Sequence, residues 1–252
     1  MHIDRVEFLG VEFNQESEPE VLARLRSVTA ETPFGYIVTP NVDHVVRLSN
    51  EELEPALDAA YADADLCVCD SRILAMLARL RGIHLPVVTG SDLTAAILNS
   101  VIVRGDRAAV VGGSAELVQR LSDLYPDVEF VHHLPPMGLR RNVAAQTAAA
   151  TFISQAKCRF TFIAVGSPQQ ELVAARVEGG TGFGLCIGAA LEFLTGDQVR
   201  APMVVRRFGL EWAHRLMSDP GRLWRRYLVE GPQVFLLAWR WKARRVVAGR
   251  PS

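Results

Sequence analysis

Short apolar runs alternate with segments of helical period along the chain as far as residue 187. The runs expected to form buried strands are residues 36–39, 66–69, 107–111, 128–131, 160–165 and 183–187. The helical segments are residues 17–29, 42–62 (two helices with a break near 49–50), 72–81, 93–103, 115–124 and 142–157. This alternation predicts an α/β fold, a mostly parallel Rossmann-like sheet with helices on both faces. Residues 6–13 are expected to form a strand or hairpin before it.

The pattern changes after Gly196, where strands stop and helices rich in Arg and Trp are expected over residues 210–217, 221–229 and 233–247. We therefore divide the chain into an α/β domain, residues 1–200, and a helical appendage, residues 201–252. Residues 200–252 hold 12 Lys or Arg and 3 Asp or Glu, a net charge of +9, whereas the rest of the chain has a net charge of −10. A basic tail on an acidic body indicates contact with an anionic surface.

Arginines and aromatic residues are interleaved in this tail, which favours a lipid–water interface. No recognised nucleic-acid motif accompanies the arginines, so we expect a membrane rather than nucleic acid. A solvated helical tail without a ligand is the alternative. The arginines proposed to meet membrane or diphosphate are Arg206, Arg207, Arg215, Arg222, Arg225 and Arg226.

The expected location is cytoplasmic and peripheral, on the inner face of the plasma membrane. The chain opens without the apolar segment of a secretory signal, and no apolar run approaches the roughly 18 residues needed to span a bilayer. The four cysteines have no metal-binding spacing and are interpreted as core residues in a reducing compartment. The apolar faces of the tail helices are compatible with a homo-oligomer.

Polar residues follow two of the predicted strands directly. Thr39, Pro40 and Asn41 end the first strand, and Asp70 ends the second. Because ligands of open parallel sheets bind beyond the carboxyl ends of the strands, we expect these residues to form the active centre. Asp70 follows four apolar residues, so partial burial is expected to raise its pKa and favour a role as a base. The alternative is that Asp70 caps the helix of residues 72–81.

Three further patterns have weaker functional interpretations. Gly112, Gly113 and Ser114 follow a buried strand and open a helix, an arrangement that cradles phosphate or is a bare turn. Asp63-Ala64-Asp65 spells a D-x-D metal and nucleotide-diphosphate pattern, but it precedes its strand, so we interpret it as a helix end at the surface. His132 and His133 are expected in a solvated loop, with a base or diphosphate role as the alternative.

Seven motifs in order resemble the WecG/TagA/CpsF glycosyltransferase family, over about residues 35–230. They are Thr39-Pro40-Asn41, residues 64–70 ending in Asp70, Thr89-Gly90-Ser91-Asp92-Leu93, residues 165–171, residues 188–193, Arg200-Ala201-Pro202 and residues 209–220.

The resemblance implies an inverting enzyme that moves a sugar from a UDP-sugar to a polyprenyl-diphosphate-linked saccharide in cell-surface polysaccharide synthesis. It implies that Asp70 is the base, that Thr39 and Asn41 lie near the acceptor, and that Gln170 is in the active site. Gly166 and Glu192, which belong to two of the motifs, join Gly112, Gly113 and Ser114 as candidate nucleotide-sugar residues. The tail resembles an appendage that touches the membrane and closes over the site. We expect no cofactor and no metal requirement.

Three positions depart from the family pattern. Ser71 stands where Asp is usually followed by Gly, Val87 where Arg is common, and Gln169 where Lys is common. In the family that Arg is a candidate diphosphate ligand, so its absence implies a subfamily, another Arg in its role (Arg72 or an arginine of the tail) or altered activity. The two lost cations also motivate an alternative function, a non-catalytic membrane-attached subunit that holds a lipid-linked glycan. A third hypothesis, a nucleotide-cofactor oxidoreductase, rests only on the glycine turn. The donor sugar and the acceptor glycan are not determined by the sequence.

Overall fold

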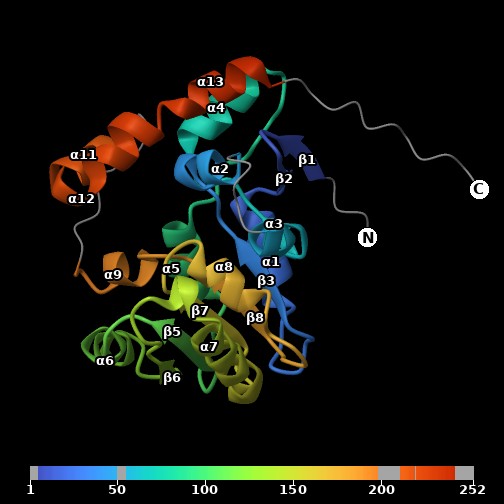
Figure 1. Ribbon diagram of the computed structural model, residues 1–252. Helices are drawn as coiled ribbons and strands as arrows, with labels where there is room; N and C mark the ends of the chain where they lie inside the picture. The colour runs from blue at the N-terminus through green and yellow to red at the C-terminus, as the bar shows by residue number, and fades with distance from the viewer. Residues whose placement is uncertain (1–4, 50–54, 198–210, 219, 242–252) are drawn as a thin grey trace, which may run out of the picture.

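A six-stranded parallel sheet forms the centre of the molecule, with strand order β4-β3-β8-β7-β5-β6. The computed structural model describes residues 5–49, 55–197, 211–218 and 220–241 (Figure 1). The strands are β3 (Gly35–Val38), β4 (Leu66–Cys67), β5 (Arg107–Gly112), β6 (Glu129–His133), β7 (Phe160–Ala164) and β8 (Phe183–Cys186). The predicted fold class is confirmed.

Helices cover both faces of this sheet because consecutive strand residues point to opposite sides. Tyr36 and Val38 belong to one core with helices α2 (Val42–Leu48), α3 (Pro55–Ala62), α4 (Arg72–Leu80), α7 (Val143–Ala156) and α8 (Gln169–Ala174). Ile37, between them, belongs to the other core. That core includes α1 (Glu18–Arg26), α5 (Gly90–Ser100), α6 (Ala115–Leu124) and α9 (Ala190–Leu194).

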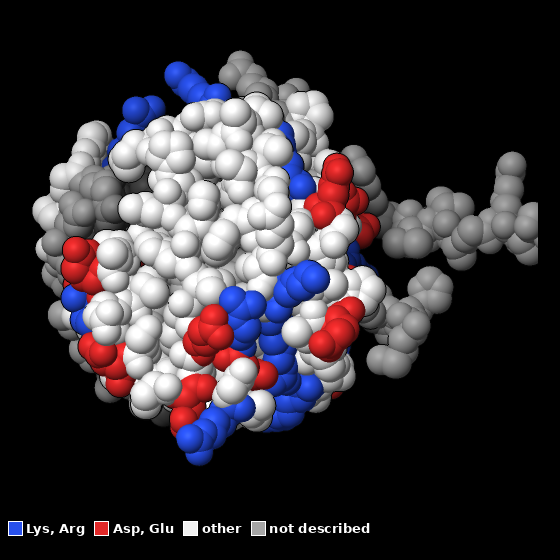
Figure 2. Space-filling view, turned by 90° about the horizontal axis from the view of Figure 1, so that it is seen from below, with Lys and Arg blue, Asp and Glu red and all other residues white. Residues whose placement is uncertain are grey.

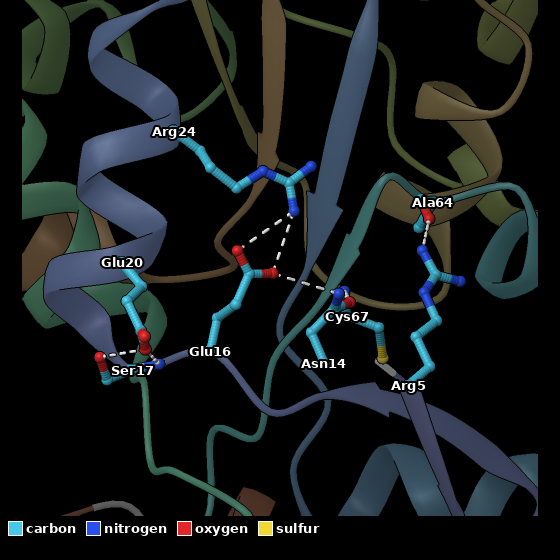
Figure 3. A network of polar contacts seen from close by, with 8 residues as sticks. All are labelled: Arg5, Asn14, Glu16, Ser17, Glu20, Arg24, Ala64 and Cys67. Atoms are coloured by element: carbon cyan, nitrogen blue, oxygen red, sulfur yellow. Dashed lines mark hydrogen bonds and ion pairs between the residues drawn. The ribbon is translucent and has the colours of Figure 1, made fainter. Parts of the chain in front are cut away.

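An antiparallel hairpin, β1 (Arg5–Phe8) with β2 (Val11–Asn14), closes the β4 edge of the sheet (Figure 3). The buried Asn14 side chain accepts a hydrogen bond from the Cys67 backbone N at 2.8 Å and donates to Glu16 at 3.3 Å. Glu16 pairs with Arg24 of α1 at 3.0 Å. An edge strand has unpaired backbone groups, and here a side-chain amide satisfies one of them. The predicted hairpin is confirmed.

The C-terminal segment consists of α11 (Glu211–Ser218), α12 (Pro220–Trp224), a π-helical turn η2 (Arg225–Glu230) and α13 (Gln233–Arg240). Helix α13 packs on α2 and α4 and buries Val234 and Ala238. Arg81 donates to the backbone oxygens of Ala238 and Trp239 at 2.5 and 2.7 Å, which satisfies carbonyls at the end of α13. Trp241 then contacts the Phe8 ring edge-on and donates to Glu7 at 3.0 Å.

Several predicted boundaries are wrong. The last helix ends at Arg240 rather than at residue 247, because Trp241 has an extended backbone. The helix expected over 221–229 is interrupted by the π-helical turn. Strand β4 has only two ladder residues, and Cys69 instead bridges Val87. The domain boundary predicted near residue 200 falls outside the described residues.

The amino edge of the sheet carries cations that are paired with acids. Figure 2 shows this face from below, with Lys and Arg side chains next to Asp and Glu side chains. Three ion pairs lie at the starts of strands β5, β6 and β7: Arg104–Asp127 at 3.3 Å, Arg107–Glu129 at 3.0 Å and Arg159–Asp106 at 2.7 Å.

Candidate active site

The polar ends of β3 and β4 meet at the carboxyl edge of the sheet. The Asp70 backbone N donates to Pro40 O at 3.0 Å, and the Thr39 hydroxyl donates to Cys186 O of β8 at 3.1 Å. After β3 the chain enters α2 on one face, and after β8 it enters α9 on the other. Neighbouring strands whose helices lie on opposite faces leave a crevice between their ends, which is where parallel sheets bind ligands. Thr39 lies between these two strand ends, and Asp70 follows β4, the neighbour of β3 on its other side.

Asp70 does not act as the N-cap of α4. That residue is Ser71, whose hydroxyl accepts a hydrogen bond from Leu74 N at 3.2 Å. The capping interpretation of Asp70 is therefore wrong, and its half-buried side chain follows β4 at the sheet edge.

Asn41 has a structural task in this edge. It is the N-cap of α2, where its side-chain oxygen accepts from Asp43 N at 3.0 Å and its own backbone N donates to His44 Nδ1 at 3.0 Å. These bonds fix the turn between β3 and α2. This β3–α2 turn keeps Thr39 and Pro40 next to Asp70.

Gln170 is buried in the first turn of α8 and reaches across to the end of β8. Its Oε1 accepts from Gly188 N at 2.8 Å, and its Nε2 donates to Glu171 Oε1 at 3.0 Å. The two bonds determine which end of the amide faces Gly188. Gln170 thus joins the site region through β8, the strand to which Thr39 is also bonded.

Glu171 is a residue that sequence reasoning missed. It is buried, and the Tyr61 hydroxyl donates to its Oε1 at 3.4 Å. Burial raises the pKa of this carboxyl, against the opposing effects of hydrogen bonds from Gln170 and Ser167 and of the Arg47 charge. Arg47 also donates to Ser167 Oγ at 3.2 Å. The only sequence signal was an acid beside an apolar helical face.

In the glycine turn after β5, the backbone passes close to residues that belong to or follow β7. Gly112 and Gly113 have φ of +93° and +69°, and a Cβ on Gly112 would lie 2.7 Å from Val165 Cγ1. Ser114 is the N-cap of α6, accepting from Leu117 N at 3.2 Å. The Nε2 atom of His132 lies 2.9 Å from Gly112 O, within hydrogen-bond distance. This histidine and His133 end strand β6, so the predicted loop is wrong there.

The turn and Asp70 lie at the same edge but are not in contact. Asp70 follows β4, and strands β3, β8 and β7 separate β4 from β5, a distance of about 19 Å at the usual spacing of strands. Gly166, with φ +75°, follows β7 between them.

Glu192 is half-buried in α9, and burial raises the pKa of its carboxyl, with the nearby Asp197 charge adding to the effect. Its Oε2 is enclosed without a hydrogen-bond partner among the residues described. A carboxylate in this state suits hydroxyl donors of a ligand.

The D-x-D pattern lies at the opposite edge of the sheet. Asp63 is exposed just beyond α3, and Asp65 accepts from Tyr36 N at 3.0 Å, as expected for a helix end at the surface. Within the described ranges, no group of three or more His, Cys, Asp or Glu is placed to hold a metal. The four cysteines are buried and unbridged, as predicted.

The tail arginines are described only in part. Arg206 and Arg207 lie outside the described residues, and so do the side chains of Arg215, Arg222 and Arg226. Arg225 is exposed and pairs with Glu230 at 3.2 Å. In the part of the chain that the structure describes, no helix has the length and apolar character required to cross a bilayer.

Comparison with known proteins matches this architecture to one family. The family model described as "Glycosyl transferase WecG/TagA/CpsF family" covers residues 6–247. The chain belongs to this family. Membership in the WecG/TagA/CpsF family confirms the predicted resemblance and the predicted enzyme class, a glycosyltransferase.

Curated members of the WecG/TagA/CpsF family resemble the chain over most of its length. A protein of Staphylococcus aureus (strain MW2) is 23% identical over 231 residues, which cover 88% of this chain and 87% of the relative. A protein of Bacillus spizizenii (strain W23) is 27% identical over 203 residues, covering 77% and 75%. Both are named N-acetylglucosaminyldiphosphoundecaprenol N-acetyl-β-D-mannosaminyltransferase.

Proposed function

We propose that the chain transfers a sugar, with inversion, from a UDP-sugar to a polyprenyl-diphosphate-linked saccharide in the synthesis of a bacterial cell-surface polymer such as teichoic acid. The names of the relatives support this class of acceptor, because they describe N-acetylglucosaminyl-diphosphoundecaprenol as the molecule that is glycosylated. Family membership and coverage of most of both chains support the extension to this protein.

Asp70 is the general base in this proposal. Its carboxylate accepts the proton of an acceptor hydroxyl while that oxygen forms a bond to the anomeric carbon, and the bond from that carbon to UDP breaks on the opposite face. The observation that supports the assignment is the hydrogen bond from Asp70 N to Pro40 O, which holds the Asp70 backbone beside the polar end of β3. Thr39, Asn41 and Gln170 border the acceptor.

The leaving diphosphate gains negative charge that must be stabilised. Four strand spacings separate Asp70 from the turn around Gly112 and Gly113, so the N–H groups there and at the start of α6 bind UDP beyond the reacting phosphate. Gly166 gives the nucleotide room, and the Glu192 carboxylate accepts from its hydroxyls. Arginines of the tail supply positive charge, so that no metal is required. The tail also docks the enzyme on the inner face of the plasma membrane.

Replacement of Asp70 by Asn tests the base. The amide is nearly isosteric but cannot accept the proton, so we expect turnover to fall about 10²–10⁴-fold with UDP binding retained. The matched control is Asp63→Asn, because Asp63 follows α3 at the other end of β4 and should be dispensable. Loss of turnover in the control would instead favour the D-x-D metal site.

The assay measures UDP released from a UDP-sugar in the presence of a polyprenyl-diphosphate-linked acceptor. Full turnover by the Asp70→Asn variant refutes the base assignment. No UDP release by the unmodified protein with any UDP-sugar favours the non-catalytic, glycan-holding subunit.

A further inference from the structure

Helix α4 exposes a continuous stripe of alternating basic and apolar side chains. Arg72, Met76, Arg79 and Leu80 are exposed, with Met76 and Leu80 at 52% and 76%. Positions i, i+4, i+7 and i+8 fall on one side of a helix. The opposite side, with Leu74, Leu77 and Ala78, is buried. The helix contains no Asp or Glu, so the stripe is a cationic and apolar surface typical of contact with lipid.

The two arginines of this stripe differ from those at the amino edge of the sheet. Arg72 and Arg79 are exposed, and neither has an ion pair with any residue that the structure describes. At the other edge, Arg104, Arg107 and Arg159 are each paired with an acid. The charge on α4 therefore remains available to an anionic ligand.

Helix α13 extends the same kind of surface beside α4. The two helices are in contact and are bonded end to end by Arg81, and both lie at the top of Figure 1. Phe235, Leu236 and Trp239 of α13 are exposed, and this helix also contains no acid. Large exposed apolar side chains on adjacent helices mark an interaction site.

The order of groups along α4 suggests the occupant. Asp70 precedes the helix, Arg72 begins it, and Met76 and Leu80 follow toward its end. Arg72 and Leu80 are about 12 Å apart along the axis at 1.5 Å per residue. A lipid-linked acceptor has its parts in the same order: sugar, diphosphate, then apolar chain. Arginine is well suited to the diphosphate and the apolar side chains to the chain.

We propose that the exposed stripe of α4 receives the polyprenyl-diphosphate part of the acceptor, with Arg72 at the diphosphate and with Met76 and Leu80 at the first part of the lipid. This inference rests on the proposed function, because it names how the acceptor of that reaction is held. The catalytic domain itself, and not only the tail, then meets the membrane surface from which the acceptor is taken.

The test is co-sedimentation of the full chain with phosphatidylcholine vesicles, with and without undecaprenyl diphosphate. We expect undecaprenyl diphosphate to increase binding of the unmodified protein to the vesicles. Arg72→Gln and Leu80→Glu should each reduce this increase in vesicle binding about 10-fold or more. The matched controls are Arg140→Gln and Val103→Glu, which change exposed residues elsewhere and should bind as the unmodified protein does. Unchanged thermal unfolding shows that each variant is folded.

Kinetics give a second readout. In the UDP-release assay, Arg72→Gln and Leu80→Glu should raise KM for the lipid-linked acceptor about 10-fold and leave KM for the UDP-sugar unchanged. Equal raising of both KM values contradicts an acceptor-specific site.

Three results overturn the inference. The first is that undecaprenyl diphosphate increases vesicle binding as much in both variants as in the unmodified protein. The second is binding that depends on Leu80 but not on undecaprenyl diphosphate, which indicates a general membrane contact. The third is a change of oligomeric state in Leu80→Glu by sedimentation velocity, which indicates an interface between copies. Vesicle binding as expected without any UDP release would refute the proposed function and leave the docking site standing.

Discussion

Replacement of Gly112 by Ala should destabilise the protein strongly, because two separate costs coincide there. The residue has φ +93°, a conformation that costs an L-residue about 1–2 kcal/mol. The new Cβ would also lie 2.7 Å from Val165 Cγ1 and 2.8 Å from Ala164 O. The carbonyl belongs to the β7 backbone and cannot rotate away, so overpacking adds about 1–3 kcal/mol.

The sum is a loss of about 2–5 kcal/mol in the free energy of unfolding. For a chain of this size, 1 kcal/mol shifts Tm by about 2–4 °C, so the expected decrease is about 4–20 °C. Differential scanning calorimetry at one fixed pH measures it. UDP binding should weaken in the same variant if the turn holds part of the nucleotide.

Gly166→Ala is the matched control. Gly166 has φ +75° at the end of the neighbouring strand β7, but nothing lies within 4 Å of a Cβ placed there. Only the conformational cost remains, about 1–2 kcal/mol, or about 2–8 °C in Tm. Equal decreases in the two variants would refute the steric part of the reasoning. A decrease in neither would refute both parts.

Two further predictions concern the buried polar residues. Burial raises the pKa of Glu171, so the folded state keeps a proton that the unfolded state releases above about pH 4.3. The contribution of Glu171 to the free energy of unfolding therefore falls as pH rises from there through the raised pKa. Glu171→Gln removes that loss, so Tm of the variant relative to the unmodified protein should rise as pH increases above about 4.3. A difference in Tm that stays constant with pH contradicts the pKa shift. Asn14→Ala leaves the buried Cys67 N without its acceptor and should cost about 1–3 kcal/mol in urea unfolding. The exposed Asn99→Ala serves as its control and should stay within about 0.5 kcal/mol.

The candidate site was predictable where it depends on strand ends. Thr39 and Asp70 each follow an apolar run, and the rule that parallel sheets bind ligands at their carboxyl ends directs attention to both. Glu171 was not predictable, because its burial depends on Tyr61 from α3 and on Arg47 from α2. The cap of α4 was ambiguous because Asp70 and Ser71 are both good N-cap residues.

The sequence by itself determined the strand and helix succession and the polar residues that end the strands. Periodicity, capping residues and turn glycines act within a few residues, so they are legible in a linear chain. Boundaries such as the ends of β4 and α13 were less certain, because pairing partners and packing decide them.

Tertiary structure alone decided which strand ends are neighbours and which helices form the outer surface. Thr39 is bonded to Cys186, 147 residues away, and Arg81 to Ala238, 157 residues away. Such contacts depend on the strand order β4-β3-β8-β7-β5-β6 and on the packing of α13 on α4. No local pattern encodes them, since they depend on which apolar faces are buried together when the whole chain folds.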